Sequence, residues 1–251
     1  MNKVLVNADD FGLSREVNDA IVYSFIHHLI DRTTLMVNMP YCNEAIKKAQ
    51  EFGFEDKIGL HINIVEGKPL TEPIKNTILC NQYGNFDGNV MKKTFNRLYF
   101  GNKEKSAIEI EIEAQIEKFL NFNIGQKHMD SHRHAHVAPS VFPIIVDKYK
   151  KYGFQSMRLA RNIPENEIGV LKRKVKDYIN NQIISLNNDN IRMFGSMKDV
   201  EKEIRMKGTK GDIELMVHPV IYNGKLCDAI EAKSLEEWLK ENEDCIRSIT
   251  L

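Results

Sequence analysis

The stretch Lys3-Val4-Leu5-Val6-Asn7-Ala8-Asp9-Asp10-Phe11-Gly12 opens with a short aliphatic, β-branched run and ends in two aspartates and a glycine. The run predicts a strand over residues 3–7, and Gly12 indicates a turn out of that strand. Ser14 is a good N-cap residue, and the apolar residues after it recur at helical spacing. The chain is therefore expected to begin as a strand that leads through an acidic turn into a helix.

The same alternation of strand and helix continues along the chain. Apolar runs predict further strands, and amphipathic segments between them predict helices. The predicted strands cover residues 33–38, 58–65, 127–131, 156–159 and 213–217, and the predicted helices cover 43–52, 106–121, 139–152, 165–186, 200–207 and 234–246. Ser234 is the predicted N-cap of the last helix. Residues 66–102 are rich in Gly, Asn, Pro and Lys without a sustained period, which predicts a loop insertion after the third strand.

Strands that are regularly separated by helices are typical of an α/β protein with a mostly parallel sheet and right-handed crossovers. The pattern fits both an open, doubly wound sheet and a closed or nearly closed barrel. No internal repeat or change of composition divides the sequence, so we expect a single domain over residues 1–251.

Charge and composition narrow the partners and the compartment. Lys and Arg number 35 and Asp and Glu number 35, and this balance gives no electrostatic reason to expect a nucleic-acid or membrane partner. No apolar stretch approaches the ~18 residues of a transmembrane helix, and too few residues precede the first strand for a secretion signal. The widely spaced cysteines, Cys42, Cys80, Cys227 and Cys245, fit reduced thiols. We therefore expect a cytoplasmic protein.

Unusual polar residues stand at the predicted carboxyl ends of the strands, where parallel α/β folds gather their reactive groups. They are Asp9 and Asp10 after the first strand, His61 in the third, His128, His132, His134 and His136 at the fourth, and His218 at a late strand. Taken singly, the Asp pair also fits a turn or a helix cap, and His61 also fits a buried core histidine. The four histidines within residues 128–136 have no packing rationale in the sequence.

Imidazole and carboxylate groups together suit a divalent metal, and a catalytic site typically has three protein ligands and an open position. Asp10, His61 and one histidine of residues 128–136 would supply such a set from three strand ends. Asp9 and His218 are then available as general base and general acid. The sequence contains no GxSxG elbow, no GxxxxGK[ST] phosphate loop and no GxGxxG after the first strand.

Four motifs, in order along the chain, resemble those of the YdjC-like carbohydrate deacetylases, a family that includes the chitooligosaccharide deacetylases. They are Asn7-Ala8-Asp9-Asp10-Phe11-Gly12-Leu13-Ser14 with Asn18, Gly59-Leu60-His61 followed by Gly67-Lys68-Pro69-Leu70-Thr71, His128-Met129-Asp130-Ser131-His132 with His134 and His136, and Glu214-Leu215-Met216-Val217-His218-Pro219.

The resemblance implies a (β/α) barrel-like fold and removal of an acetyl group from an N-acetylated sugar. It also implies a metal held by Asp10, His61 and His132, with Asp9 as the base and His218 as the acid. Family members are described as magnesium-dependent homodimers, although zinc, cobalt or manganese would suit two imidazoles better than magnesium.

The leading hypothesis is a metal-dependent hydrolase that acts on the acetamido group of a sugar or short oligosaccharide. Arg158 is a candidate to bind a sugar hydroxyl or to orient Asp9, and a surface ion pair is the alternative. Two other functions fit the same residues. One is a phosphoesterase with Arg133 and Lys68 near the phosphate, and the other is a sugar-binding protein without catalysis.

Overall fold

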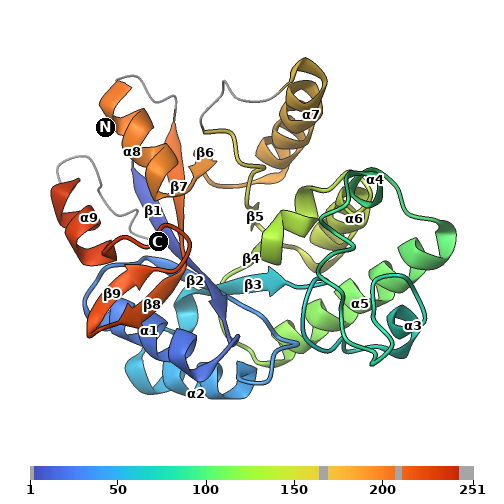
Figure 1. Cartoon of the computed structure of the whole chain (residues 1–251), viewed down its shortest axis with the longest axis horizontal. Coiled ribbons are helices and arrows are strands. Elements are labelled where there is room, and N and C mark those ends of the chain that lie inside the picture. The colour runs from blue at the N-terminus through green and yellow to red at the C-terminus, as the bar shows by residue number, and fades with distance from the viewer. Residues whose placement is uncertain (1–2, 164–168, 207–210, 243–251) are drawn as a thin grey trace.

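The computed structural model describes residues 3–163, 169–206 and 211–242 (Figure 1). In this part of the chain the main sheet has seven strands in the order β5-β4-β3-β2-β1-β7-β6, and every neighbouring pair is parallel. The strands are β1 (Val4–Phe11), β2 (Arg32–Leu35), β3 (Ile58–Ile62), β4 (His128–Ser131), β5 (Ser156–Met157), β6 (Ile191–Gly195) and β7 (Asp212–Val217).

Helices connect the strands and cover the outside of the sheet (Figure 1). The longer ones are α1 (Arg15–Ile26), α2 (Cys42–Phe52), α5 (Asn102–Asn121), α6 (Phe142–Tyr152), α7 (Val170–Leu186), α8 (Met197–Met206) and α9 (Leu235–Glu241). The predicted caps are confirmed at both ends of the chain, because Ser14 accepts a hydrogen bond from the Val17 amide and Ser234 accepts one from the Glu237 amide. Among the described residues, no helix combines the length and the apolarity that a membrane crossing requires.

The strand order distinguishes the barrel from the open sheet. Starting at β1, the strands follow one another as β1 to β5, and β7 then β6 lie on the other side of β1, which is the circular order of a barrel opened between β5 and β6. The sheet curls into a half-barrel (Figure 1). Across its open side, the Asn162 side chain accepts a hydrogen bond from the Phe194 amide at 2.8 Å. The predicted barrel-like α/β fold is therefore confirmed.

The insertion begins after β3, as predicted, and runs to α5. It holds two short helices, α3 (Glu72–Lys75) and α4 (Thr94–Leu98), and α3 packs against α5. The insertion also lies beside the site, because its first residues follow directly from the strand that carries His61.

Several predicted boundaries shift, and two features were missed. The helix predicted over 139–152 begins at Phe142, the strand over 156–159 ends at Met157, and the helix over 200–207 begins at Met197. The predictions at residues 165–168, 207 and 243–246 fall outside the described residues. Strand β6 was missed because its short sequence, IRMFG, has no clear alternation of apolar and polar residues.

The second missed feature is an antiparallel hairpin, β8 (Pro219–Tyr222) and β9 (Lys225–Asp228). Its turn is Asn223-Gly224, and both residues have positive φ angles, 49° and 74°. Asn-Gly is the usual signal for such a turn, so this hairpin was readable in the sequence. The hairpin lies against α1 and follows His218 directly.

Alternate positions on neighbouring strands carry polar side chains that contact one another. Residues two apart in a strand point to the same face of a sheet, and the polar positions here follow that spacing. They are Asn7 and Asp9 in β1, Arg32 and Thr34 in β2, and His128 and Asp130 in β4, all of them buried. One face of the half-barrel is therefore a buried polar layer beneath the carboxyl ends of the strands.

Candidate active site

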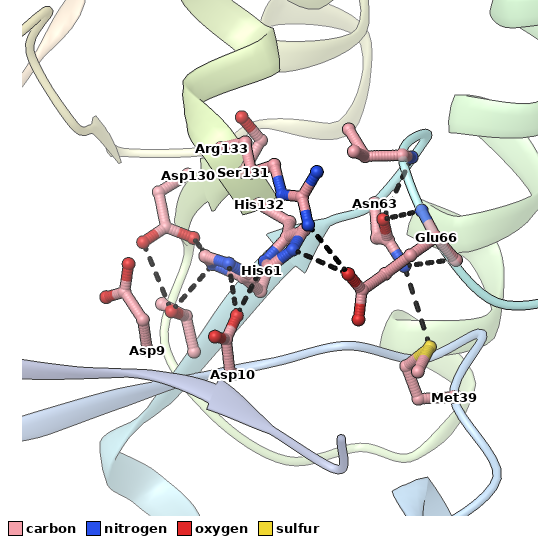
Figure 2. Close-up of polar contacts among 12 residues, drawn as sticks. Asp9, Asp10, Met39, His61, Asn63, Glu66, Asp130, Ser131, His132 and Arg133 are labelled. Carbon is pink, nitrogen blue, oxygen red and sulfur yellow. Dashed lines mark hydrogen bonds and ion pairs between the residues drawn. The ribbon is translucent and has the colours of Figure 1, made fainter. Parts of the chain in front are cut away.

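Asp10, His61 and His132 converge at the carboxyl end of the half-barrel (Figure 2). The Asp10 Oδ1 atom lies 3.2 Å from Nε2 of His61 and 2.8 Å from Nδ1 of His132. The three residues come from the end of β1, from β3 and from the residue after β4. This group of one carboxylate and two imidazoles could hold a metal ion.

The backbone at the end of β1 separates the two aspartates. Asp10 has a φ of 69°, a left-handed conformation that is costly for a residue with a Cβ. The turn is closed by the Leu13 amide, which donates to the Asp10 carbonyl, and by the Gly12 amide, which donates to the Asn18 side chain. As a result Asp10 faces the two histidines, while Asp9 takes other partners.

Each histidine of the cluster contacts a second carboxylate through its other nitrogen. The Nδ1 atom of His61 lies 2.6 Å from Asp130, and Nε2 of His132 lies 3.3 Å from Glu66. A carboxylate only accepts, so in the neutral ring Nδ1 of His61 carries the hydrogen and Nε2 keeps its lone pair. That Nε2 atom is buried without a hydrogen-bond partner. An orphaned imidazole nitrogen facing Asp10 is what a metal ligand requires, and the residues present fit a metal.

The pKa shifts of these groups show that the cluster favours positive charge. Burial opposes a charge on His61, but the Asp130 carboxylate outweighs it and raises the pKa of His61 to about 10. Burial likewise opposes a charge on His132, and its contacts with Asp10 and Glu66 outweigh it and raise its pKa. For Asp10, burial is outweighed by the two histidines, and its pKa falls well below the usual range. The carboxylates therefore favour the protonated imidazoles, and a metal ion would have to displace those protons in order to bind.

Beneath the cluster, Arg158 ties three buried carboxylates together. Its guanidinium binds Asp9 through two hydrogen bonds of 2.6 and 2.7 Å, contacts Asp130 at 2.8 Å, and donates through Nε to Glu214 at 2.8 Å. The side chain is fully buried and stacks over the Phe194 ring. Burial lowers the pKa of Arg158, but the Asp130 and Asp9 carboxylates outweigh it and hold the pKa above its usual value.

The position of Arg158 bears on its predicted role. It is not a surface ion pair, because none of its side chain is exposed. It also does not line the cavity above the site, so it has no access to a sugar hydroxyl. Its contacts correspond to the other predicted role, the orientation of Asp9.

The buried charges of this layer do not balance among themselves. The carboxylates are Asp9, Asp10, Asp130 and Glu214, and the guanidiniums are Arg158 and Arg32, the latter 3.0 Å from Glu214. Four negative and two positive charges leave a surplus of two negative charges when the histidines are neutral. Buried charges require compensation, and a single divalent cation at Asp10 would supply it.

His218 stands across the site from the histidine cluster, immediately before the β8–β9 hairpin. Its amide donates to Asp228 at 2.7 Å, and its Nδ1 atom lies 3.7 Å from the same carboxylate. Burial opposes the protonation of His218, but Asp228, Asp9 and Asp10 outweigh it and raise its pKa above 6.5. His218 therefore holds a proton more readily than an ordinary histidine.

A cavity of about 380 Å³ opens above these groups. Its lining includes Asp9, Asp10, His61, His132 and His218, so the five residues predicted as catalytic or metal-binding face one space. The rest of the lining is Leu13, Val17, Arg133, His134, Met216, Pro219, Val220, Ala229 and Ile230. A second cavity of about 520 Å³ shares His134, Met216, His218 and Ile230 with the first.

The other histidines of residues 128–136 divide between packing and the cavity. His128 pairs with Ser156, and His136 bridges Ser131 and the Arg158 carbonyl, so both have the packing rationale that the sequence did not reveal. His134 lines both cavities.

A family model described as "YdjC-like protein" matches residues 3–244. The chain belongs to this family. The carbohydrate deacetylase of Thermoanaerobacter pseudethanolicus is 30% identical over 235 residues, which cover 90% of this chain and 84% of that protein. A carbohydrate deacetylase of Vibrio cholerae serotype O1 is 37% identical over 170 residues, which cover 67% of this chain and 60% of that protein.

The YdjC-like chain also resembles a solved structure. The crystal structure of a "putative cellobiose-phosphate cleavage protein" from Enterococcus faecalis V583 matches 99% of this chain and 97% of its own, with a TM-score of 0.69 and 18% identity. At this identity the likeness shows a shared fold.

Sequence reasoning missed several residues of the YdjC-like site. Asp130 was noticed only as part of a histidine-rich segment, and Asp228 and Glu66 lie in segments without a recognisable period. Asn7, which donates to Asp9 at 2.8 Å, was readable from its spacing, because Asn7 and Asp9 are two apart in one strand.

Replacing Arg158 with methionine should lower the free energy of unfolding by about 3 to 5 kcal/mol, because it leaves buried carboxylates without compensation. Urea denaturation measures the change. The control is Arg15→Met, since Arg15 is 66% exposed and pairs with Glu44 at the surface, and we expect it to cost about 1 kcal/mol or less. Equal losses in the two variants would contradict the central role of Arg158.

Proposed function

We propose that this protein is a metal-dependent hydrolase that removes the acetyl group from an N-acetylated sugar or short oligosaccharide. The observation that carries the proposal is the common cavity of Asp9, Asp10, His61, His132 and His218, which joins a metal-binding group to a base and an acid. The relatives named carbohydrate deacetylase support the choice of substrate and bond.

Asp10, His61 and His132 would hold one divalent metal ion. When bound, the ion would polarise the acetyl carbonyl and acidify a water molecule. The family resemblance favours magnesium, whereas two imidazoles favour zinc, cobalt or manganese. The surplus of two buried negative charges supports a divalent ion of either kind.

Asp9 acts as the general base in this proposal. Arg158 grips both of its carboxylate oxygens and Asn7 donates to one of them, so the carboxylate is fixed in orientation. Oδ1 accepts from both Asn7 and Arg158, whereas Oδ2 accepts from Arg158 and keeps a second lone pair. The side chain lines the cavity beside Asp10. Asp9 can therefore take the proton of a water that attacks the acetyl carbon.

His218 acts as the general acid. The attack forms a new carbon–oxygen bond, and the amide carbon–nitrogen bond then breaks. The departing nitrogen needs a proton, and His218 lines the same cavity, where Asp228 raises its pKa and so favours its protonated form. The products are acetate and the free amine of the sugar.

The walls of the cavity suit a sugar ring. Leu13, Met216, Val220 and Ile230 offer apolar surface near the polar groups, a combination that is common in sites for small organic ligands. The adjoining second cavity provides room for a further sugar unit.

The proposal also includes a homodimer located in the cytoplasm, as the family resemblance implies. Sedimentation-velocity ultracentrifugation should then give a mass of twice 29.0 kDa. A monomer at all concentrations would contradict the dimer without affecting the proposed reaction.

Metal-stripped and metal-restored protein should differ when incubated with diacetylchitobiose. Mass spectrometry should detect loss of one acetyl group with the restored protein alone. Release of phosphate from sugar phosphates, without acetate, would favour a phosphoesterase. Tight sugar binding without any product would favour a sugar-binding protein.

Replacing Asp9 with asparagine should lower kcat by about 10²- to 10⁴-fold, because the base is lost, while metal binding persists through Asp10, His61 and His132. Acetate release and calorimetric metal titration measure the two effects separately. Asp19→Asn is the control, since Asp19 is an exposed partner of Lys48, and it should leave both unchanged. Full activity of Asp9→Asn would remove Asp9 from the mechanism.

The pH dependence of kcat/KM should follow the ionisation of His218. Because the acid must be protonated, kcat/KM should fall as the pH rises through the pKa of His218, which lies above 6.5. Asp228→Asn removes the negative charge that supports the proton, so the alkaline midpoint should move to lower pH. Glu237→Gln, at an exposed surface pair with Lys225, should leave the midpoint in place. An unshifted midpoint in Asp228→Asn would contradict the role of His218.

A further inference from the structure

Glu66 stands where the insertion leaves the strand that carries His61, and it contacts the cluster from the side opposite Asp10 (Figure 2). Its Oε2 atom lies 3.3 Å from Nε2 of His132 and 3.4 Å from Nη2 of Arg133. Its backbone amide and carbonyl bind the side chain of Asn63. The proposed catalytic steps do not use this carboxylate.

The backbone of Glu66 is fixed by a buried asparagine. The Asn63 Oδ1 atom accepts hydrogen bonds from the amides of Val65 and Glu66, at 3.0 and 3.1 Å, and its Nδ2 atom donates to the Glu66 carbonyl at 2.8 Å. Asn63 is itself held by Gln115 of α5, which bonds both its amide and its carbonyl. The backbone of Glu66 is therefore fixed in a turn, from which its side chain reaches His132.

The two histidines of the cluster use opposite nitrogens toward Asp10. His61 turns Nε2 toward Asp10 and Nδ1 toward Asp130, while His132 turns Nδ1 toward Asp10 and Nε2 toward Glu66. A carboxylate behind an imidazole selects the tautomer whose hydrogen it accepts. Glu66 and Asp130 therefore have the same position relative to the cluster: each carboxylate contacts the imidazole nitrogen that is turned away from Asp10.

We propose that Glu66 is a positioning residue of the metal site. With a metal ion bound, Glu66 would accept the Nε2 hydrogen of His132, which would leave the Nδ1 lone pair for the ion and couple the insertion to the metal. This inference rests on the proposed metal site, because it concerns how one of its three ligands is oriented. Arg133 donates to the same Glu66 oxygen that lies beside Nε2 of His132.

Titration calorimetry with Zn²⁺ and with Co²⁺ tests the role in three variants. Glu66→Ala should weaken metal affinity by about 10- to 100-fold, as loss of a carboxylate behind a ligating histidine typically does. Glu66→Gln should retain most of the affinity, because its amide oxygen still accepts from Nε2. Glu72→Ala is the matched control, since Glu72 is a glutamate of the same insertion that is 81% exposed, and it should bind as the parent does.

A spectroscopic measurement separates positioning from general stability. The visible absorption of bound Co²⁺ depends on the geometry of its ligands, so the spectrum should change in Glu66→Ala and be restored in Glu66→Gln. Circular dichroism of the metal-free variants should show the same fold in all of them. Unchanged metal affinity in Glu66→Ala would overturn the inference, and so would equal losses in Glu66→Ala and Glu66→Gln.

These results are distinguishable from failure of the proposed function. If the parent protein binds neither ion, the metal site itself is refuted. If the parent binds metal but releases no acetate, the proposed reaction fails while the comparison of Glu66 variants still decides the role of Glu66.

Discussion

The site depends on the uncompensated negative charge buried beneath the carboxyl ends of the strands. Arg158 and Arg32 neutralise part of it, and their contacts hold Asp9 and Glu214 in place. Asp10 has no guanidinium partner among the described residues, and Asp130 shares Arg158 with Asp9 and Glu214; these two carboxylates lie on either side of His61. A buried surplus of this kind is costly unless a cation or protons relieve it, so the same charges would favour the binding of a metal ion.

This constraint explains why Asp9 and Asp10 differ although they are neighbours. Asp9 is held by a guanidinium and an amide, and it cannot leave them without exposing buried charge. Among the described residues, the Asp10 carboxylate contacts the imidazoles of His61 and His132, which could exchange a proton for a metal ion. The left-handed backbone at Asp10 produces this division, and strain at a functional residue is tolerated where surrounding contacts over-determine it.

Much of the architecture could be predicted from the sequence, because the spacing of apolar residues in a strand or helix is set within a few neighbouring residues. The alternation of elements, the caps at Ser14 and Ser234, and the position of the insertion followed from patterns within a few residues. The convergence of Asp10, His61 and a histidine of residues 128–136 followed from a topological rule, since parallel strands end at one edge. The choice of His132 among those histidines came from the family resemblance. Partners such as Asp130 for His61 or Asp228 for His218 depend on side-chain directions in three dimensions, and the sequence around them carries no periodic signal.

The insertion adds a further link between fold and chemistry. The Asn63 turn is anchored to α5 through Gln115, and α5 also receives Leu70 and Thr71 through the buried carboxylate of Glu111. The segment that follows β3 is thus hydrogen-bonded to α5 at two points, Asn63 and residues 70–71. Loops that bear functional groups need a rigid base if those groups are to keep their geometry. Glu66 lies between these two anchors, and this placement suits a group that must hold an imidazole in one orientation.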